Sequence, residues 1–428
     1  MFAQSIFHAL GLRPESVAAA ETLGYTTPTP VQIDAIPAIL EGCDVIATAP
    51  TGTGKTLAFC LPLVELIYHS NTNAQRYPRA LIITPTRELA AQVADILNQL
   101  IAQLNNALKT HSSQMLSSPP IKLSTVFGGV SINPQMMQLR GGADIVVATP
   151  GRLLDLLASN ALQLSNVKTL VLDEADKLLD ANFADELTRL LVYLPSKRQN
   201  LFFSATFSDE LKKLAAVHLH LPVDIVSGQI KNPIPDIEQR AVMVDSIKRT
   251  QLLIHLFNTS GWGRALVFVA TKYGSEHIAE KCNRAGLVAQ AFNGDMSQGA
   301  RSDALIALKS GKLQLLITTD LASRGIDIDQ LPVVVNYDLP RSADDYIHRI
   351  GRTGRAGQLG VAVSFVSSQA KAHFRLIEKR QNQRIEQFIV PGFEPTEAAP
   401  VVLDPAGGIK GRRLSKKDKL RALQVSKL

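Results

Sequence analysis

The chain has 428 residues, of which 46% are hydrophobic and 19% charged, so it is longer than one ordinary domain core and too apolar to be largely disordered. We therefore expect two folded domains. The last 19 residues carry eight basic and one acidic residue, and residues 1–409 hold 37 of each sign, so the net charge of +7 lies wholly in the C-terminal segment. This balance excludes a general basic excess over the folded part as a means of binding a polyanion there.

Three cysteines, Cys43, Cys60 and Cys282, lie far apart and have no spacing suited to a zinc site or a disulfide framework. The first residues lack the basic start, apolar core and small-residue cleavage site of a secretory signal, and no apolar run reaches about 18 residues. We expect a cytoplasmic protein in a reducing compartment, with no membrane among its partners.

Short apolar segments rich in β-branched residues alternate with helical patterns along the chain. The segments of the first half are ALIITPT (80–86), ADIVVATP (143–150) and KTLVLDEAD (168–176), and those of the second half are RALVFVAT (264–271), LQLLITTD (313–320) and VVVNYDLP (333–340). This alternation predicts an α/β fold with two tandem domains, each a parallel sheet flanked by helices.

The segment SGQIKNPIPDIEQ (227–239) contains Gly, Asn and two prolines, which break helices and strands, so the hinge between the domains is placed there. A turn-rich spacer followed by a basic segment ends the chain and predicts a flexible basic tail. The predicted organisation is a first domain at 1–228, a linker at 229–239, a second domain at 240–390 and a tail at 391–428.

The run DVIATAPTGTGKTLAF (44–59) predicts a buried strand, a glycine-rich turn and a helix, which is the setting of a phosphate-binding loop. Gly52 and Gly54 would let backbone N–H groups approach phosphates, Lys55 would reach the β and γ phosphates, and Thr56 would ligate Mg²⁺. The alternative is a glycine-rich turn without a ligand.

VLDEAD (171–176) places carboxylates at the end of an apolar strand, where a parallel sheet opens its ligand crevice. Asp173 suits water-mediated Mg²⁺ binding, and Glu174 suits the orientation and deprotonation of an attacking water. A merely solvated strand end is the alternative, which the phosphate loop upstream disfavours. Gln32 has an amide that matches the N6 and N7 edge of adenine, although a glutamine at this place could equally mark a helix start.

From about Phe7 to Gly357 the chain resembles the DEAD-box RNA helicases. The resemblance comprises Phe7 with Gln32, APTGTGKT (49–56), PTRELA (85–90), GG (128–129), TPGR (149–152), DEAD (173–176), SAT (204–206), LVFVAT (266–271), QGAR (298–301), TTDLASRGIDI (318–328) and HRIGRTGR (348–355). It implies two RecA-like domains, and the short tail is most similar to bacterial, RhlE-like members. Pro50, where the family commonly has glutamine, and Asn293, where histidine is frequent, are departures that remove no essential chemistry.

The resemblance implies ATP and Mg²⁺ as cofactors. The residues implied to bind the nucleotide are Phe7, Gln32, Ala49, Pro50, Thr51, Gly52, Thr53, Gly54, Lys55, Thr56 and Asp327, the last at the ribose. Arg352 and Arg355 are implied as arginine fingers that complete a catalytic set of Lys55, Asp173 and Glu174, with Thr56 and Asp173 on the metal. A polar network of Asp176, Ser204, Thr206 and His348 is implied to couple nucleotide state to domain closure.

RNA contacts in the family follow the sugar-phosphate backbone, so sequence preference is expected to be weak. The residues carried over are Pro85, Thr86, Arg87, Gly129, Thr149, Gly151, Arg152, Gly294, Arg301 and Thr318. The implied function is RNA-stimulated ATP hydrolysis coupled to local unwinding of short duplexes or remodelling of RNA–protein complexes, in ribosome assembly or RNA decay, with ribosomal RNA or pre-ribosomal particles as partners.

Two other functions stay open at this point: a clamp that uses ATP only to lock onto RNA, and a DNA helicase. The basic tail is expected to add electrostatic affinity for RNA, the alternative being a solvated tail.

Overall fold

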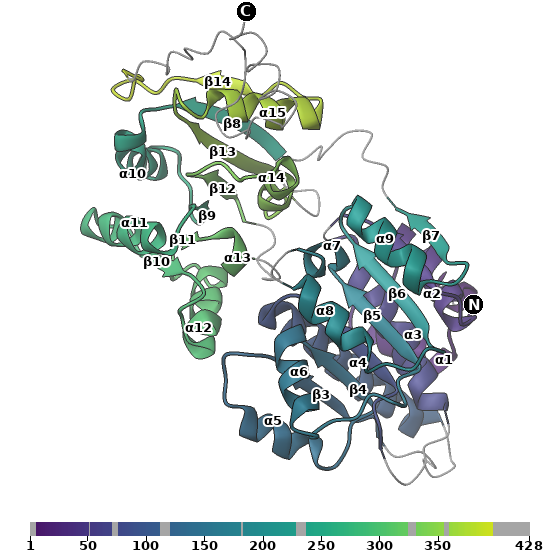
Figure 1. Ribbon diagram of the computed structural model, residues 1–428. Helices are drawn as coiled ribbons and strands as arrows, with labels where there is room; N and C mark the ends of the chain where they lie inside the picture. The colour runs from purple at the N-terminus through teal and green to yellow at the C-terminus, as the bar shows by residue number, and fades with distance from the viewer. Residues whose placement is uncertain are drawn as a thin grey trace, which may run out of the picture.

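The computed structural model describes residues 6–50, 52–70, 76–111, 120–180, 183–227, 237–323, 331–354 and 359–396. Within these ranges the chain forms two α/β domains, each built on one seven-stranded sheet whose strand pairs are all parallel (Figure 1). The predicted fold class, two tandem parallel sheets flanked by helices, is confirmed.

The first sheet has the strand order β3-β4-β2-β5-β6-β1-β7. Its strands are β1 (Val45–Thr48), β2 (Ala80–Ile83), β3 (Leu123–Val126), β4 (Ile145–Ala148), β5 (Thr169–Asp173), β6 (Gln199–Ser204) and β7 (Val223–Val226). The helices of this domain are η1 (Ile6–Leu10), α1 (Pro14–Thr22), α2 (Pro30–Leu40), α3 (Lys55–His69), α4 (Arg87–His111), α5 (Ile132–Leu139), α6 (Pro150–Ala158), α7 (Ala175–Leu178), α8 (Ala184–Leu191) and α9 (Asp209–His218).

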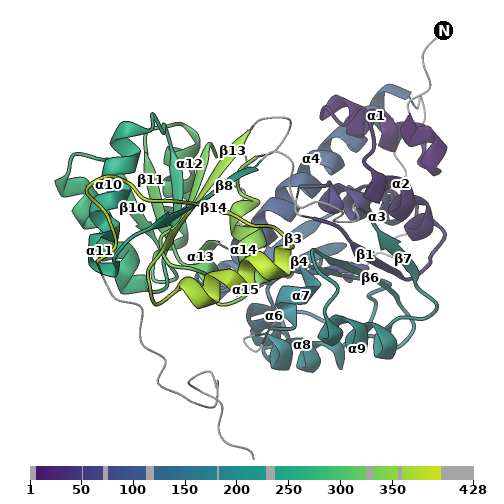
Figure 2. The same cartoon turned by 90° about the horizontal axis from the view of Figure 1, so that it is seen from above.

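Helices cover both faces of the first sheet, so side chains that point to opposite sides of its central strands are buried. In β2, Ala80 and Ile82 join the core beneath α1 to α4, and Leu81 and Ile83 join the core beneath α5, α6, α8 and α9. Figure 2 shows the two sets of helices on opposite sides of the sheet. The central strands therefore contain continuous apolar residues instead of an alternating pattern.

The second sheet has the order β10-β11-β9-β12-β13-β8-β14. Its strands are β8 (Ile237–Met243), β9 (Ala265–Phe268), β10 (Ala289–Phe292), β11 (Leu315–Thr318), β12 (Val333–Asn336), β13 (Gly360–Val366) and β14 (Glu386–Phe388). The helices are η2 (Ser246–Lys248), α10 (Arg249–Thr259), α11 (Lys272–Arg284), α12 (Gln298–Lys309), α13 (Asp320–Ser323), α14 (Ala343–Ile350) and α15 (Lys371–Gln381). Helices α10 and α11 cover one face, and α12 to α15 cover the other.

The limits of the second domain differ in detail from the predicted ranges. Strand β8 begins at Ile237, three residues inside the predicted linker, and residues 391–396 pack on the domain. The Thr396 N–H and hydroxyl donate to the buried Asp245 carboxylate at 2.9 and 2.7 Å, and the Phe393 ring lies 5.3 Å from that of His255. The rest of the predicted tail lies outside the described residues. No helix in the described ranges is long and apolar enough to cross a membrane.

Candidate nucleotide and RNA site

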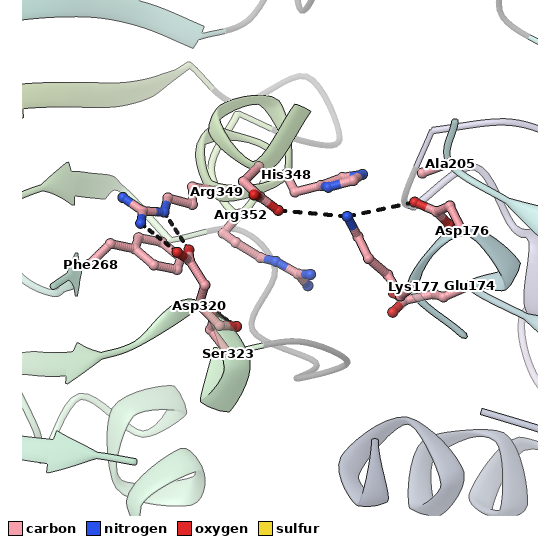
Figure 3. A pocket seen from close by; sticks show the side chains of 11 residues that line it. Glu174, Asp176, Lys177, Ala205, Phe268, Asp320, Ser323, His348, Arg349 and Arg352 are labelled. Atoms are coloured by element: carbon pink, nitrogen blue, oxygen red, sulfur yellow. Dashed lines mark hydrogen bonds and ion pairs between the residues drawn. The ribbon is translucent and has the colours of Figure 1, made fainter. Parts of the chain in front are cut away.

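The candidate site lies where the carboxyl ends of β1, β5 and β6 face helix α14 of the second domain. A pocket there is lined by side chains from both domains (Figure 3), and its residues are Glu174, Asp176, Lys177, Ala205, Phe268, Asp320, Ser323, Asp345, His348, Arg349 and Arg352. Parallel strands bring their carboxyl ends to one edge, so segments more than 100 residues apart in the sequence meet at this pocket.

The phosphate loop joins β1 to α3, as the sequence predicts. Gly52 and Gly54 have φ of 84° and 87°, a left-handed conformation that glycine adopts without a Cβ penalty. The Lys55 ammonium is buried and donates to the Ala49 carbonyl at 2.6 Å, and the Thr53 hydroxyl donates to the Pro50 carbonyl at 2.7 Å. The loop is therefore folded around the lysine that is predicted to hold phosphates.

Gln32 lies on α2 directly against this loop. Its Nε2 donates to the Gly54 carbonyl at 3.0 Å, and its Oε1 accepts the Thr29 N–H at 3.0 Å in the capping box that begins α2. An amide has two N–H donors and two acceptor lone pairs, so one of each is left for an adenine edge. Gln32 thus ties the predicted base contact to the phosphate loop. Phe7 is fully buried in the core near α1 and α2, where it has no exposed surface to touch a nucleotide.

Asp173 ends β5 and Glu174 follows it, so both carboxylates lie at the carboxyl end of the strand. Burial, reinforced by Glu174, raises the pKa of Asp173 to about 7, and Lys55 opposes the rise. Burial also raises the pKa of Glu174, while Arg352 of the second domain opposes it. Glu174 has φ and ψ of 52° and 51°, a conformation that non-glycine residues rarely adopt. Such strain is typical of functional positions, because surrounding structure must hold it.

Asp176 is the centre of the predicted coupling network. It accepts hydrogen bonds from the Ser204 hydroxyl at 2.7 Å and the Thr206 hydroxyl at 3.2 Å. Although burial alone would raise the pKa of Asp176, Lys177, the Ser204 hydrogen bond and His348 hold it below its ordinary value. Burial and Lys177 lower the pKa of His348 to about 4, so its imidazole is neutral at neutral pH. The structure brings all four predicted residues together across the domain interface.

Of the residues predicted to face the phosphates from the second domain, Arg352 lines the pocket. Arg355, Asp327 and Thr51 lie outside the described residues, so their predicted roles remain predictions.

The predicted RNA residues of the first domain follow the three strands at one side of its sheet. Pro85, Thr86 and Arg87 follow β2, Gly129 follows β3, and Thr149, Gly151 and Arg152 follow β4. Arg87 packs its guanidinium against Gly129, which has φ of 77° and no room for a Cβ. Arg152 donates to the Val130 carbonyl at 2.7 Å, and its Nη1 has no hydrogen-bond partner within the described ranges. In the second domain, Gly294 follows β10 and Thr318 ends the neighbouring β11.

Arg301 differs from its predicted role. Only 6% of the residue is exposed. Its guanidinium pairs with Glu88 of the first domain at 2.7 Å and donates to the Asn293 and Ala322 carbonyls at 3.2 and 3.0 Å. The charge predicted to meet an RNA phosphate is instead matched by a carboxylate across the interface. Asn293 itself is buried and holds its turn through Glu276 and Asp295, so the departure from histidine leaves this turn formed.

Four charged residues of the pocket have no role in the sequence-based prediction: Lys177, Asp320, Asp345 and Arg349. Arg349 forms a bidentate ion pair with Asp320, with N–O distances of 2.5 and 2.7 Å. The Lys177 ammonium lies 3.6 Å from an Asp345 carboxylate oxygen. Three of the four lie in or directly beside quoted motifs, but their partners are distant in sequence. Only the tertiary structure pairs them.

Thr56 and Asp173 supply hydroxyl and carboxylate oxygens, which are the donors that Mg²⁺ prefers. Burial raises the pKa of Asp173 to about 7 although Lys55 opposes the rise, so a further cation would fit beside this carboxylate. The described residues contain no group of three or more His, Cys, Asp or Glu that could hold a metal by themselves. Mg²⁺ sites commonly have few protein ligands and take phosphate oxygens and waters in addition. The donor set therefore fits Mg²⁺ bound together with a nucleotide.

Comparison with known proteins agrees with this geometry. The sequence pattern of the DEAD/DEAH box helicases matches residues 29–214, and that of the helicase conserved C-terminal domain matches residues 248–357. The chain is 36% identical over 389 residues to the DEAD-box ATP-dependent RNA helicase CshA of Geobacillus kaustophilus. This alignment covers 91% of this chain and 79% of CshA. It is 37% identical over 385 residues to the ATP-dependent RNA helicase DeaD of Buchnera aphidicola, with 90% of this chain covered. The chain spans 61% of the length of that DeaD protein.

Solved structures show the same two-domain arrangement. Dbp5 of S. cerevisiae, bound to RNA and ADP BeF3, has a TM-score of 0.78 and 29% identity, covering 90% of this chain and 96% of its own. Mss116p bound to ssRNA and AMP-PNP has a TM-score of 0.79 and 27% identity, covering 91% of this chain and 79% of its own. With residues of the DEAD, SAT, TTDLASRGIDI and HRIGRTGR motifs at one inter-domain pocket and the matches spanning both domains, the chain belongs to the DEAD-box family of RNA helicases.

Proposed function

We propose that the protein is an ATP-dependent RNA helicase that hydrolyses ATP between its two domains and uses domain closure to unwind short RNA duplexes or remodel RNA–protein complexes. The observation that carries the proposal is the pocket in which Arg352 of the second domain faces Glu174 of the first (Figure 3). A site divided between two bodies is complete only when they meet, so hydrolysis depends on whatever favours closure.

In this proposal the phosphate loop binds the triphosphate through its backbone N–H groups and Lys55. Mg²⁺, held by Thr56 and Asp173, would neutralise phosphate charge when bound. Glu174 orients the attacking water and takes its proton, for which its raised pKa suits it better than that of an ordinary carboxyl. Arg352, with Arg355, stabilises charge that develops on the γ-phosphate.

RNA is proposed to lie along the residues that follow β2, β3 and β4 in the first domain and β10 and β11 in the second. These positions are small, hydroxyl-bearing or basic, as backbone recognition requires, so base preference is weak and 2′-OH contacts favour RNA over DNA. A strand that spans both domains binds best when they are together. ATP and RNA therefore raise each other's affinity.

We propose a cytoplasmic location and structured RNA such as ribosomal RNA as a target. All three cysteines are free, and Cys60 and Cys282 are fully buried, which fits a reducing compartment. The basic residues from Lys410 to Lys427 would add affinity for any folded RNA. Removal of residues 408–428 should flatten the salt dependence of RNA affinity, and an unchanged slope would exclude this role of the tail.

The test of the proposed activity is ATP hydrolysis by the purified protein with and without single-stranded RNA. Matched DNA is the polymer control, and the Lys55→Ala variant is the inactive control. Strong stimulation by RNA alone, lost in the variant, is the expected result. Activity indifferent to RNA, or equal with DNA, would overturn the proposal.

A further inference from the structure

We propose that Lys177 is a positioning residue for domain closure, because its ammonium joins Asp176 of the first domain to Asp345 of the second. The inference rests on the proposed function and assigns to it a residue that none of the catalytic or RNA-binding predictions includes. Lys177 lies on α7, directly after the DEAD carboxylates, and Asp345 lies in the first turn of α14.

Figure 3 shows the Lys177 ammonium joined to the Asp176 carboxylate by a dashed line. Its Nζ lies 3.7 Å from Asp176 Oδ2 and 3.6 Å from Asp345 Oδ1. The side chains of Lys177 and Asp345 are 15% and 24% exposed, and that of Asp176 is 6% exposed. Solvent therefore screens the bridge less than an ordinary surface ion pair.

Asp345 is held in place from its own domain. Its Oδ2 accepts the Ser342 hydroxyl at 2.7 Å, and its N–H donates to the Ser342 oxygen at 3.0 Å, which caps the start of α14. The other carboxylate oxygen is the one that faces Lys177. Because these hydrogen bonds hold Asp345 against the first turn of α14, its contact with Lys177 restrains the whole helix and not only the Asp345 side chain.

The same helix carries the groups that act on the nucleotide site. His348 lies one turn beyond Asp345, and Arg352 follows just after the helix ends at Ile350. Both line the pocket with Glu174. When Lys177 holds Asp345, it sets the position of His348 against Asp176 and of Arg352 against the γ-phosphate site.

The charges explain why a cation is needed at this point. Asp176 and Asp345 approach from different domains, and two carboxylates alone would repel each other and oppose closure. The Lys177 ammonium between them attracts both carboxylates and offsets this repulsion. Lys177 therefore lowers the electrostatic cost of bringing the two carboxylates together, which a residue that merely packs within the first domain would not do.

The test uses the full chain and four variants: Lys177→Met, Asp345→Asn, the double variant, and Lys177→Arg as the conservative control. Asparagine at 345 keeps an oxygen for the Ser342 hydroxyl. Lys212→Met is the matched control, because Lys212 pairs with Asp209 at 2.9 Å within one helix, with 51% and 80% of the side chains exposed. The measurements are kcat, the RNA concentration that gives half-maximal ATPase activity on oligoadenylate, and KM for ATP without RNA.

Lys177→Met should raise the half-maximal RNA concentration roughly ten-fold and lower kcat, while Asp345→Asn alone should change it only about two- to three-fold. KM for ATP without RNA should stay unchanged, because the phosphate loop is untouched. The decisive result is non-additivity: Asp345→Asn should recover part of the loss in Lys177→Met, since it removes the carboxylate that repels Asp176. Lys177→Arg and Lys212→Met should behave like the unsubstituted protein.

Equal behaviour of Lys177→Met and the unsubstituted protein would overturn the inference, and so would losses that simply multiply in the double variant. Dyes on cysteines introduced at the exposed Val192 and Ile247, in a Cys43→Ser background, report the closed fraction by energy transfer and separate closure from chemistry. If the unsubstituted protein were not stimulated by RNA, the proposed function itself would fail. If it were stimulated but insensitive to residues 177 and 345, only the role of Lys177 would fail.

Discussion

Arg301 of the second domain and Glu88 of the first form an ion pair 2.7 Å long, with 7% and 6% of their side chains exposed. The pair lies on the side of the molecule where the predicted RNA residues follow the sheet strands, and the Arg301 guanidinium also stacks 4.4 Å from the centre of the Phe292 ring. A buried pair between two domains exists only when they are together, so it favours closure.

Glu88→Gln should therefore weaken the cooperation between RNA and ATP. The half-maximal RNA concentration for ATPase activity should rise at least roughly ten-fold, because Arg301 would stay buried without its partner charge. A titration with oligoadenylate measures this. If Arg301 instead acted as the predicted RNA contact, removal of Glu88 would release it and RNA would bind equally well or better.

Glu174→Gln should lower kcat for ATP by roughly 100-fold or more, because it removes the base while the amide keeps the shape of the side chain. The phosphate loop does not depend on this group, so the variant should bind ATP and RNA and retain both. Single-turnover hydrolysis and the lifetime of the RNA complex are the measurements. Turnover near that of the unsubstituted protein would assign the base elsewhere.

Gly54→Ala should abolish nucleotide binding, because a Cβ at this position would overlap the Gln32 amide in addition to the strain at φ of 87°. Gly24→Ala is the matched control: Gly24 has φ of 88°, but apart from its chain neighbours no atom of the described residues lies within 4 Å of its Cβ position. Both variants should lose about 1 kcal/mol of stability from the backbone alone. Only Gly54→Ala should lose affinity for ATP in equilibrium titration, and equal losses in both would remove Gln32 from the explanation.

The pH dependence of closure should follow His348. Its pKa falls to about 4 in the pocket, where it faces Lys177, Asp176, Arg352 and Asp345. The pocket favours the neutral form, so this contribution to closure is fully present above the ordinary value of about 6.5 and is lost as pH falls toward 4. Between pH 7 and 5.5, RNA affinity in the presence of ATP should weaken about eight-fold from this group. His348→Gln should flatten that part of the profile, and a retained slope would assign it to another residue.

The sequence predicts well those structural features that depend on residues close together in the chain. The phosphate loop needs a strand, two glycines, a lysine and a threonine within one short run. The structure forms the predicted strand β1 before the loop and the predicted helix α3 after it, and the role of the loop in binding stays a prediction. The six other predicted strands also form, since continuous apolar segments bury both faces of a parallel sheet. The Asp176, Ser204 and Thr206 network was predicted from the family resemblance, and the structure gives it hydrogen bonds.

The parts that needed the tertiary structure are the pairings between domains and the burial of single side chains. The family resemblance implies Phe7 as a nucleotide contact, whereas in the structure Phe7 is fully buried in the core. The family resemblance implies Arg301 as an RNA contact, whereas in the structure it forms an ion pair with Glu88, which lies 213 positions earlier in the chain. No sequence pattern links Lys177 with Asp345. The order of neighbouring residues establishes which chemical groups lie at each strand end, because those groups are adjacent in the chain. Only the meeting of the two domains decided which charges neutralise one another, because Coulomb attraction depends on distance in space and not along the chain.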